Sequence, residues 1–494
     1  MNSIITAQNL SFELPNGREL FKNLNITINS KLTALVGPNG VGKTCLARLL
    51  ANELEPTTGS IRRTNTVTLF SQRQDPEMIT VDEFLAQDYT WSPLGDKLLQ
   101  NIDRQAFCTT LSGGEWMRVR LTRTLGDQFL ILDEPTNDLD RDGRAALIQF
   151  LTENQAGALL ISHDRECLSL CDDILELSNK GLSKFGKGWH AYLEEKQQEQ
   201  SSQQTALEVA KRERDQSHLE RQCQIQRQEK RNQRGKAAAI KGGMPKILIG
   251  ARKRRAQATT GRIDNATYET ATAAVRDAHE ALTDLKIDPV MYADLIGYEI
   301  PNQKLIVEAK NFNIKFQDWL YKEDLNFTWR GNIRIAIKGA NGSGKSTLLK
   351  AILGETFETR GELRRGKVNT LVIDQRCAVL NDNESILENI RSVSTATESE
   401  IRTALARFLF TKDSVFQKVG ELSGGERLRA ALARGFLGSA RPELLVLDEP
   451  TNNLDLANIE FLEGLVRGFR GALLVVSHDE VFLGNCGVES EVGV

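Results

Sequence analysis

Short runs of apolar residues alternate with segments of helical spacing through most of this 494-residue chain. Leu32–Val36 is such a run, and the segment Cys45–Leu50 that follows has its apolar residues at helical spacing. Because buried strands that alternate with helices are typical of a parallel sheet covered on both faces, the pattern predicts an α/β fold. The expected strands are Leu32–Val36, Phe129–Leu132, Ala158–Ile161, Ile333–Ile337, Leu444–Leu447 and Ala472–Val476, and the expected helices include Cys45–Leu50 and Thr347–Ile352.

The stretch between residues 197 and 285 has a different pattern. Residues 197–234 are rich in Gln, Glu, Arg and Lys, which is typical of a long solvated helix. Gly235 and the sequence from Gly242 to Pro245 would break that helix. An apolar stripe then returns at Ile263, Thr267, Ala271, Ala274, Val275, Ala278, Leu282 and Leu285. We therefore expect an antiparallel helical hairpin, whose arms of about 40 residues would reach on the order of 60 Å.

Four motifs occur twice in the same order, which identifies an internal repeat. Each copy contains a glycine-rich loop and the sequences Leu-Ser-Gly-Gly-Glu, Leu-Asp-Glu-Pro-Thr-Asn and Ser-His-Asp. The motifs begin at Gly37, Leu111, Leu132 and Ser162, and again at Gly339, Leu422, Leu447 and Ser477. The repeat predicts two copies of one domain, at residues 1–190 and 303–494, joined by a linker at residues 191–302.

The glycine-rich loop has the pattern Gly-x-x-x-x-Gly-Lys-Ser/Thr between an expected strand and an expected helix, which identifies a P-loop. Its glycines allow turns that point backbone N–H groups at phosphate oxygens, and the helix adds its positive end. Lys43 and Lys345 would reach the β- and γ-phosphates of ATP, and the hydroxyls of Thr44 and Ser346 would bind Mg²⁺. The expected phosphate-binding residues are Gly37, Pro38, Asn39, Gly40, Val41, Gly42, Lys43 and Thr44, and Gly339, Ala340, Asn341, Gly342, Ser343, Gly344, Lys345, Ser346 and Thr347.

Two carboxylates follow a buried strand in each copy. Asp133 and Asp448 are expected to hold Mg²⁺. Glu134 and Glu449 lie one residue further on, where each could polarise an attacking water as the general base. Loop acids can also cap a helix, but here both pairs accompany a P-loop, which favours the catalytic interpretation.

One histidine and one glutamine recur at matched positions. His163 and His478 each lie 30 residues after the aspartate of their own copy. Such a histidine can satisfy a loop hydrogen bond, but the repeated position favours a γ-phosphate sensor. Gln72 and Gln375 end strand-like runs, 29 and 30 residues after their lysines. A lone glutamine there is usually surface decoration, whereas the repeated spacing favours contact with Mg²⁺ and the attacking water.

Taken together, these motifs resemble those of the ATP-binding cassette (ABC) ATPases, because Leu-Ser-Gly-Gly-Glu is the signature of that superfamily. Two cassettes in one chain, with Asp-Glu-Pro-Thr-Asn-x-Leu-Asp at 133–140 and 448–455, resemble the ABC-F subfamily. The resemblance covers residues 1–190 and 303–494. It implies a soluble cytoplasmic ATPase of the kind that serves as a translation factor or ribosome-protection protein at the ribosomal E site.

The resemblance also implies that the two cassettes of one chain form a head-to-tail sandwich, in a monomer, with two ATP molecules between them. The P-loop of each cassette would then face the signature sequence of the other. Site one would use Ser423, Gly424 and Gly425, and site two would use Ser112, Gly113 and Gly114. Asp140 and Asp455 match the loop that couples the two sites, and we expect both sites to hydrolyse ATP.

The adenine contact departs from the family pattern in one copy. Phe316 lies 29 residues before Lys345, where many cassettes have an aromatic residue that stacks on adenine. The same spacing from Lys43 gives Leu14, with Phe12 two residues earlier. Residues two apart on a strand share a face, so Phe12 is a candidate substitute.

Charge changes the interpretation of the linker. The chain has 63 Lys+Arg and 66 Asp+Glu, a net charge of −3. Residues 211–262 contain 16 of the basic and 4 of the acidic residues, so this stretch carries +12 and the rest −15. A basic stretch with Arg252-Lys253-Arg254-Arg255 beside a Gly/Pro tip favours phosphate contacts with RNA, although a solvated spacer is the commoner meaning of a charge run. In ABC-F proteins this linker meets the P-site tRNA.

The sequence therefore predicts an ATP-hydrolysing ABC-F protein that binds the ribosome, contacts rRNA and P-site tRNA, and is released on hydrolysis. It leaves open whether the protein serves general translation or antibiotic resistance. An ATPase subunit of a membrane transporter is one alternative, which the basic linker disfavours. A DNA-processing ABC ATPase is another, but such proteins usually have longer coiled coils or cysteine zinc sites. No uncharged apolar run approaches the roughly 18–20 residues that cross a bilayer, so no membrane insertion is expected.

Overall fold

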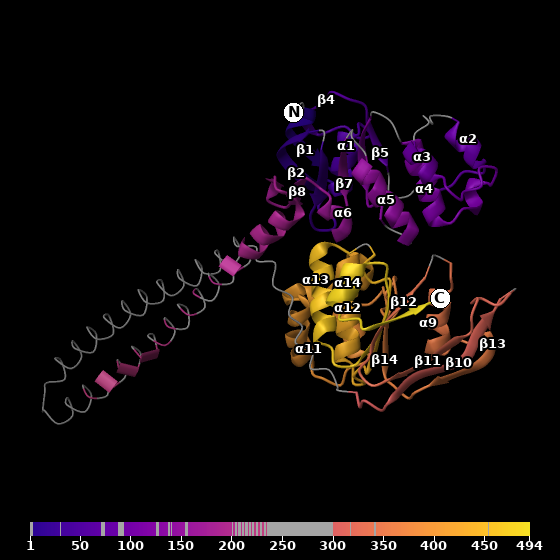
Figure 1. The fold of residues 1–494 in the computed structure, drawn as a ribbon. Coiled ribbons are helices and arrows are strands. Elements are labelled where there is room, and N and C mark those ends of the chain that lie inside the picture. The colour runs from indigo at the N-terminus through magenta and orange to yellow at the C-terminus, as the bar shows by residue number, and fades with distance from the viewer. Residues whose placement is uncertain are drawn as a thin grey trace, which may run out of the picture. The chain divides into compact units, whose positions relative to one another are not determined.

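The structure, a computed structural model, describes most of both predicted copies. The described residues are 3–29, 31–70, 75–86, 93–124, 128–136, 139, 141–153, 157–199, 300–316, 318–339, 342–452 and 454–494, with single positions between 201 and 234. The chain divides into two compact units, one formed by Met1–Tyr192 with Met291–Val494 and the other by Leu193–Val290 (Figure 1). The predicted hairpin tip and most of the basic stretch at 211–262 lie outside the described residues.

The first copy, residues 3–190, is a mixed α/β structure. Its elements are β1 (Ser3–Glu13), β2 (Glu19–Asn29), β3 (Leu32–Val36), α1 (Lys43–Leu50), β4 (Thr58–Arg63), β5 (Val67–Phe70), α2 (Val81–Leu85), α3 (Pro93–Leu98), η1 (Cys108–Thr110), α4 (Gly113–Arg123), β6 (Phe129–Asp133), α5 (Arg141–Glu153), β7 (Ala158–Ile161), α6 (Arg165–Ser169), β8 (Asp173–Ser178) and β9 (Gly181–Phe185).

The second copy, residues 303–494, repeats this order with small changes. Its elements are β10 (Leu305–Lys315), β11 (Leu325–Arg330), β12 (Arg334–Lys338), α9 (Lys345–Leu353), β13 (Glu358–Arg365), β14 (Thr370–Ile373), α10 (Ile386–Arg391), α11 (Glu398–Leu405), η2 (Ala406–Phe408), η3 (Lys412–Phe416), η4 (Val419–Glu421), α12 (Gly424–Leu437), β15 (Leu444–Asp448), α13 (Leu456–Gly468), β16 (Ala472–Val476), α14 (Glu480–Asn485) and β17 (Ser490–Gly493).

Parallel sheets form the centre of each copy, as predicted. The strand order is β5-β6-β7-β3-β8-β9 in the first copy and β14-β15-β16-β12-β17 in the second. Every pair in these two sheets is parallel except β8 with β9. Each copy adds a three-stranded antiparallel sheet, β2-β1-β4 or β11-β10-β13, so the predicted α/β class with mixed sheets is confirmed.

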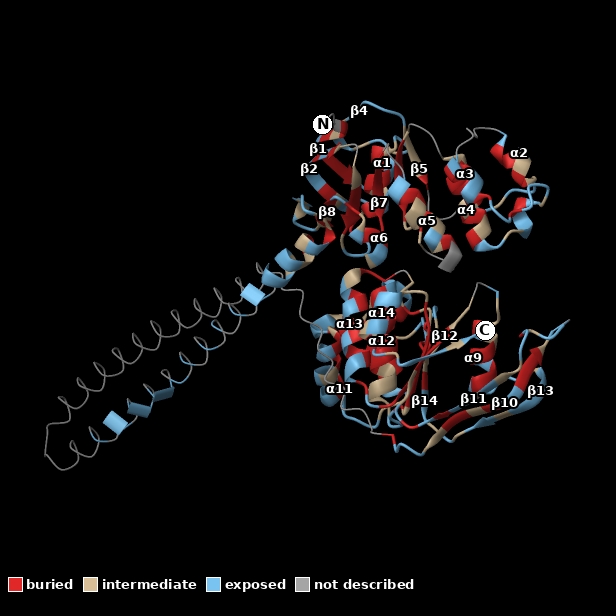
Figure 2. Cartoon of the chain, in the orientation of Figure 1, coloured by how far each residue is buried: buried red, intermediate tan, exposed pale blue. Residues whose placement is uncertain are grey.

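The central strands are buried on both faces, which matches their continuous apolar sequences. Along β15, Leu445 and Leu447 point into one hydrophobic core, and Leu444 and Val446 point into another. The buried residues follow the strands and the inner faces of the helices (Figure 2). The predicted strand Ile333–Ile337 is observed one residue later. β6 and β15 also run one residue further than predicted, because Asp133 and Asp448 still pair with Ile161 and Val476.

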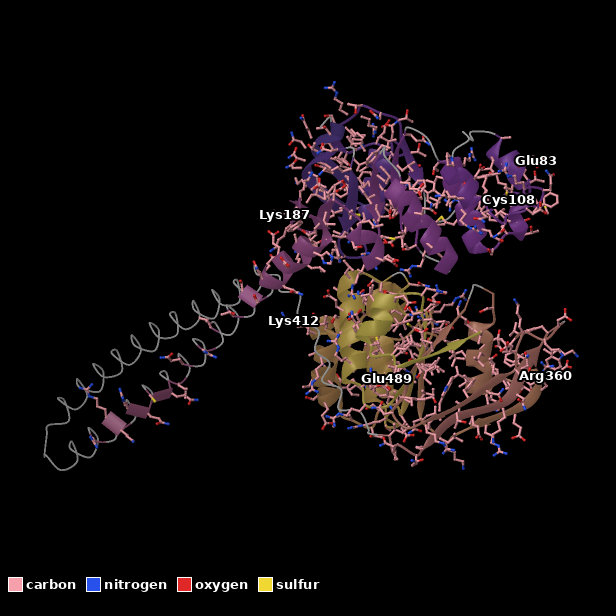
Figure 3. The ribbon with its side chains drawn as sticks, viewed as in Figure 1. Glu83, Cys108, Lys187, Arg360, Lys412 and Glu489 are labelled. Atoms are coloured by element: carbon pink, nitrogen blue, oxygen red, sulfur yellow. The ribbon has the colours of Figure 1, made fainter. Side chains whose placement is uncertain are left out.

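Capping boxes begin several helices of the helical subdomain that carries the signature sequence in each copy. Thr80 and Glu83 form one at the start of α2, where Figure 3 labels Glu83. In such a box the serine or threonine accepts a hydrogen bond from the glutamate N–H, and the glutamate carboxylate accepts one in return. The same arrangement begins α4, α10, α11 and α12. Among the described residues, no helix combines the length and apolar character that a bilayer span requires.

Arg334 joins three elements of the second copy. Its guanidinium, at the start of β12, donates hydrogen bonds to the carbonyls of Val466, Phe469 and Cys486. These carbonyls end α13 and α14, where the negative end of a helix favours a cation. The contact therefore fixes the helices of the second copy against its central sheet.

We expect Arg334→Leu to destabilise the second copy by about 2–4 kcal/mol, because it leaves part-buried carbonyls without their charged donor. The thermal unfolding midpoint of the full chain measures this. The matched control is Arg330→Leu, which removes an exposed guanidinium that donates to the carbonyl of Gln303. Equal midpoints for the two variants would contradict the assigned role.

Candidate active site

The P-loop, the Asp-Glu pair and the histidine loop of each copy begin at the carboxyl ends of neighbouring parallel strands. In the first copy, β7 pairs with β3 on one side and with β6 on the other. In the second copy, β16 pairs in the same way with β12 and β15. Parallel strands end at one edge of their sheet, so the P-loop, the Asp-Glu pair and the histidine loop of each copy meet there.

Each P-loop leads into a helix whose first N–H groups lack a side-chain cap. Gly42 is the N-cap of α1 with φ 105°, and Gly344 is the N-cap of α9 with φ 99°. These left-handed conformations favour glycine. The exposed amides at a helix N-terminus form a site for phosphate, which fits the predicted P-loop function.

The P-loop lysines are buried among backbone oxygens. Lys43 is 8% exposed, and its Nζ lies 2.7 Å from the carbonyl oxygen of Gly37 and 3.2 Å from Nε2 of His163. Lys345, also 8% exposed, donates to the carbonyl of Gly339 at 2.9 Å. Burial lowers the pKa of Lys43, since it removes water from the ammonium group. The carboxylates of Glu134, Asp455 and Asp133 attract this cation and oppose the shift.

The predicted bases share an unusual backbone conformation that the sequence did not reveal. Glu134 and Glu449 both have φ 47°, in the left-handed region that side chains other than glycine rarely adopt. Each backbone N–H donates to the strand that carries the histidine loop, Glu134 to Ile161 at 2.8 Å and Glu449 to Val476 at 2.9 Å. Strain at the same position in both copies is typical of a functional site.

The base and the histidine of each copy lie together. Oε1 of the glutamate is 3.5 Å from Nε2 of the histidine, both for Glu134 with His163 and for Glu449 with His478. Burial raises the pKa of Glu134 to about 8, although Lys43 opposes the shift. Burial and Lys43 together lower the pKa of His163 to about 3. The imidazole is therefore neutral at physiological pH, which suits a hydrogen-bonding sensor.

The aspartates and hydroxyls predicted to hold Mg²⁺ are in contact. Burial raises the pKa of Asp133 and Asp448, while hydrogen bonds from Thr44 and Ser346 oppose the shift. Oδ1 of Asp448 is buried and has no hydrogen-bond partner among the described residues. Hard oxygen ligands of this kind fit Mg²⁺. Among the described residues, no group of three or more His, Cys, Asp or Glu side chains is arranged to hold a metal ion by itself.

A cavity of about 160 Å³ brings catalytic candidates of the second copy together with residues of the first. Its lining includes Gln375, Glu449 and His478, together with Thr136, Leu139 and Arg144. The backbone N–H of Asn39, in the first P-loop, donates to Oδ2 of Asp455 at 3.2 Å. Residues of both copies therefore line this cavity, and the two copies also meet at the first P-loop. Gln72, Asp140, Ala340 and Asn341 lie outside the described residues.

The signature serines cap the helices that follow them. The hydroxyls of Ser112 and Ser423 accept from the N–H groups of Glu115 and Glu426, and those carboxylates accept from the serine N–H groups. At the N-termini of α4 and α12 the serines, Gly113 and Gly424 are exposed, whereas Gly114 and Gly425 are buried. Their pairing with the opposite P-loops stays a prediction.

The two copies differ at the predicted adenine contact. Phe316 is 59% exposed, and its ring makes an edge contact with that of Phe357, with the centroids 6.3 Å apart. Phe12 is only 9% exposed and stacks on Phe21, with the ring centroids 6.2 Å apart. Phe12 is thus a core residue and does not substitute for Leu14, which is half-buried.

Arg144 lines the cavity but was missed by the sequence analysis. The signal that could have found it is a break in the repeat. Counted from Asp140 and Asp455, Arg144 occupies the position that Ile459 has in the second copy. A cation in place of a buried apolar residue indicates a local difference between the copies.

Comparisons with known proteins agree with this geometry. A family model described as ABC transporter matches residues 21–137 and 322–452. The ATP-binding protein Uup of Buchnera aphidicola subsp. Schizaphis graminum is 29% identical over 493 residues, covering 94% of this chain and 77% of the relative. The ribosome protection protein VmlR of Bacillus subtilis is 27% identical, covering 98% of this chain and 85% of the relative.

One solved structure supports the fold over nearly the whole chain. It is the archaeal ribosome recycling factor aABCE1, in complex with the ribosomal stalk protein aP1, with a TM-score of 0.59 and 16% identity. The match covers 98% of this chain and 87% of that chain. At this identity the similarity concerns the fold alone.

The raised pKa of Glu134 predicts a pH-dependent effect of Glu134→Gln on the nucleotide-free protein. A folded carboxyl with a pKa of about 8 keeps its proton where the unfolded chain has lost it. The wild-type protein therefore loses stability as pH rises from the ordinary glutamate value toward 8, whereas Gln does not titrate. We expect the excess unfolding temperature of Glu134→Gln over wild type to grow from pH 5 to pH 8 and then to level off.

The control is Glu153→Gln, at an exposed carboxylate whose pKa a hydrogen bond from Gln149 lowers. Its stability difference from wild type should not grow in this pH window. A pH-independent difference for Glu134→Gln would contradict the assignment.

Proposed function

We propose that this chain, which belongs to the ATP-binding cassette (ABC) family and to its ABC-F branch of tandem cassettes, acts on the ribosome. The family match in both copies makes the chain an ATP-binding ATPase. The cavity that joins Glu449 and His478 to residues of the first copy is the observation that best supports two composite ATP sites in one chain.

The two sites use the same chemistry in this proposal. The amides at the N-termini of α1 and α9, with Lys43 and Lys345, bind the phosphates. Thr44, Asp133 and Gln72 would hold Mg²⁺ in site one, and Ser346, Asp448 and Gln375 would hold it in site two, where it would supply positive charge to the phosphates. Glu134 and Glu449 take the proton of the attacking water, and the histidines hydrogen-bond the γ-phosphate.

Each nucleotide also meets the opposite copy. Ser423, Gly424 and Gly425 close site one, and Ser112, Gly113 and Gly114 close site two, because exposed helix N-termini attract the γ-phosphate. Phe316 stacks on adenine in site two. The contact between Asn39 and Asp455 supports this pairing, since it joins the first P-loop to the loop before α13.

Ribosome binding is the proposed output of ATP binding. It is supported by the similarity along nearly the whole chain to VmlR, a ribosome protection protein, and by the net +12 of residues 211–262. In this proposal the chain binds the E site as a monomer in the cytoplasm, its basic linker contacts rRNA and P-site tRNA, and hydrolysis releases it. Arginine and lysine side chains suit backbone phosphates without base readout.

The double variant Glu134→Gln, Glu449→Gln tests the bases and the ribosome together. We expect ATP turnover to fall at least about 100-fold, because general-base catalysis contributes a factor of this order. The ATP-bound protein should then co-sediment with ribosomes. The control adds Lys43→Ala and Lys345→Ala, which remove phosphate binding and should abolish co-sedimentation. Turnover at the parental rate refutes the assignment of Glu134 and Glu449 as general bases. Absence of the protein from the ribosome pellet refutes the proposed ribosome binding.

Neutralising Arg252, Lys253, Arg254 and Arg255 to glutamine tests the linker. We expect weaker ribosome binding with a shallower dependence on salt, since fewer phosphate contacts release fewer counterions. ATP turnover without ribosomes should not change. The matched control neutralises four exposed basic residues of the second copy, Lys322, Arg364, Arg365 and Lys367. Equal losses in the two sets would argue against a specific linker contact.

A further inference from the structure

Arg144 connects the two histidine loops of the molecule. It lies in the first turn of α5, and its Nη1 donates to the backbone carbonyl of His478 at 2.9 Å. Its Nη2 donates to Oδ2 of Asp164, the residue that follows His163. One guanidinium thus joins the loop of one predicted γ-phosphate sensor to the loop of the other.

The anchor of Arg144 on its own copy is rigid. Oδ1 of Asp164 accepts from the N–H groups of Glu166 at 2.9 Å and Cys167 at 3.2 Å, so this carboxylate caps α6. The side chains of Arg144 and Asp164 are 15% and 5% exposed. A charge-assisted bond that is shielded from water is stronger than one on the surface. Arg144 is therefore held by the first copy and reaches the second.

A neighbouring ion pair strengthens the same contact. Nη1 of Arg165 lies 2.7 Å from Oε1 of Glu463, with side chains 14% and 7% exposed. The same Oε1 also accepts from Nδ2 of Asn485 at 3.1 Å. Glu463 thereby links α13 and α14, the two helices that flank the loop of His478 in sequence, to the first copy.

In these contacts between the copies, the arginines belong to the first copy, and the corresponding residues of the second copy cannot make the same contacts. Counted from Asp140 and Asp455, Glu463 corresponds to Ile148, as Arg144 does to Ile459. Counted from the two histidines, Arg165 corresponds to Glu480, which pairs with Lys338 of its own copy at 2.7 Å. The cations come from the first copy, and the second copy has an apolar or acidic residue at each corresponding position.

We propose that Arg144 is a positioning residue for ATP hydrolysis at site two. It holds the backbone of His478, so that the imidazole stays 3.5 Å from Glu449 in the cavity that Arg144 itself lines. Among the described residues, Ile459 has the corresponding position for site one, and it cannot donate a hydrogen bond to the loop of His163. The two ATP sites therefore differ in how the opposite copy orients their catalytic groups. This inference concerns ATP turnover and does not depend on ribosome binding.

Steady-state ATP hydrolysis by the full chain without ribosomes tests the proposal. Arg144→Ile introduces the residue that the second copy has at the corresponding position. We expect it to lower kcat about tenfold with KM changed less than twofold, since misplacing a catalytic group slows chemistry more than binding. Arg144→Lys should give an intermediate kcat, because an ammonium can donate to both oxygens but lacks the planar fork.

The control, Arg104→Ile, breaks an exposed ion pair with Asp96 inside the first copy and should leave kcat unchanged. A kcat for Arg144→Ile within twofold of wild type, or a change in KM alone, overturns the proposal.

Single-base backgrounds locate the effect. With Glu134→Gln only site two keeps its base, and with Glu449→Gln only site one does. Adding Arg144→Ile should reduce turnover in the first background and leave it within twofold in the second. Equal losses in both backgrounds overturn the assignment to site two.

Reversing the charges of Arg165 and Glu463 distinguishes loss of their contact from misfolding as the cause of a lower kcat. Arg165→Glu and Glu463→Arg should each lower kcat, because each places like charges face to face, and the double exchange should restore at least half of it. Loss without restoration, in proteins with unchanged unfolding temperatures, shows that the contact does not form during turnover and overturns the proposal.

Discussion

Hydrogen bonding of β7 between β3 and β6, and of β16 between β12 and β15, brings the chemical groups of each copy to one edge of its sheet. The P-loop, the Asp-Glu pair and the histidine are distant in sequence, yet their strands end side by side. The buried apolar side chains on both faces of these strands hold the register. A one-residue slip of β6 against β7 would move Asp133 and Glu134 away from the P-loop.

Burial of charge is the second feature that shapes this edge. Nζ of Lys43 and Oε1 of Glu134 both lie close to Nε2 of His163. Burial shifts the pKa of each of the three groups in the direction that favours its neutral form. The backbone of Glu134 adds conformational strain. Buried groups with pKa values shifted in this way are typical of a functional site. Glu134 and His163 are among the groups proposed to act on the attacking water and the γ-phosphate.

The two copies have the same chemistry but differ in how they are supported. Phe316 is exposed where the first copy has a half-buried Leu14, and Arg144 stands where the second copy has Ile459. Arg165 and Glu463 add a contact that the corresponding residues cannot make in reverse. Repetition of the motifs therefore does not make the sites equivalent, because the motif residues, which are proposed to bind the nucleotide, are held by residues between the motifs that differ in the two copies.

The sequence by itself determined the α/β class, the repeat, the two P-loops and the carboxylates and histidines that follow the central strands. It could do so because burial imposes continuous apolar runs, and phosphate binding imposes fixed glycine spacing, on the chain locally. It did not reveal the left-handed φ of Glu134 and Glu449, the core position of Phe12, or the bridge made by Arg144. Those depend on groups brought together from positions far apart: Arg144 and His478 are separated by 334 residues. No local pattern records such a contact, because its energy comes from desolvation and geometry that exist only when both copies are folded.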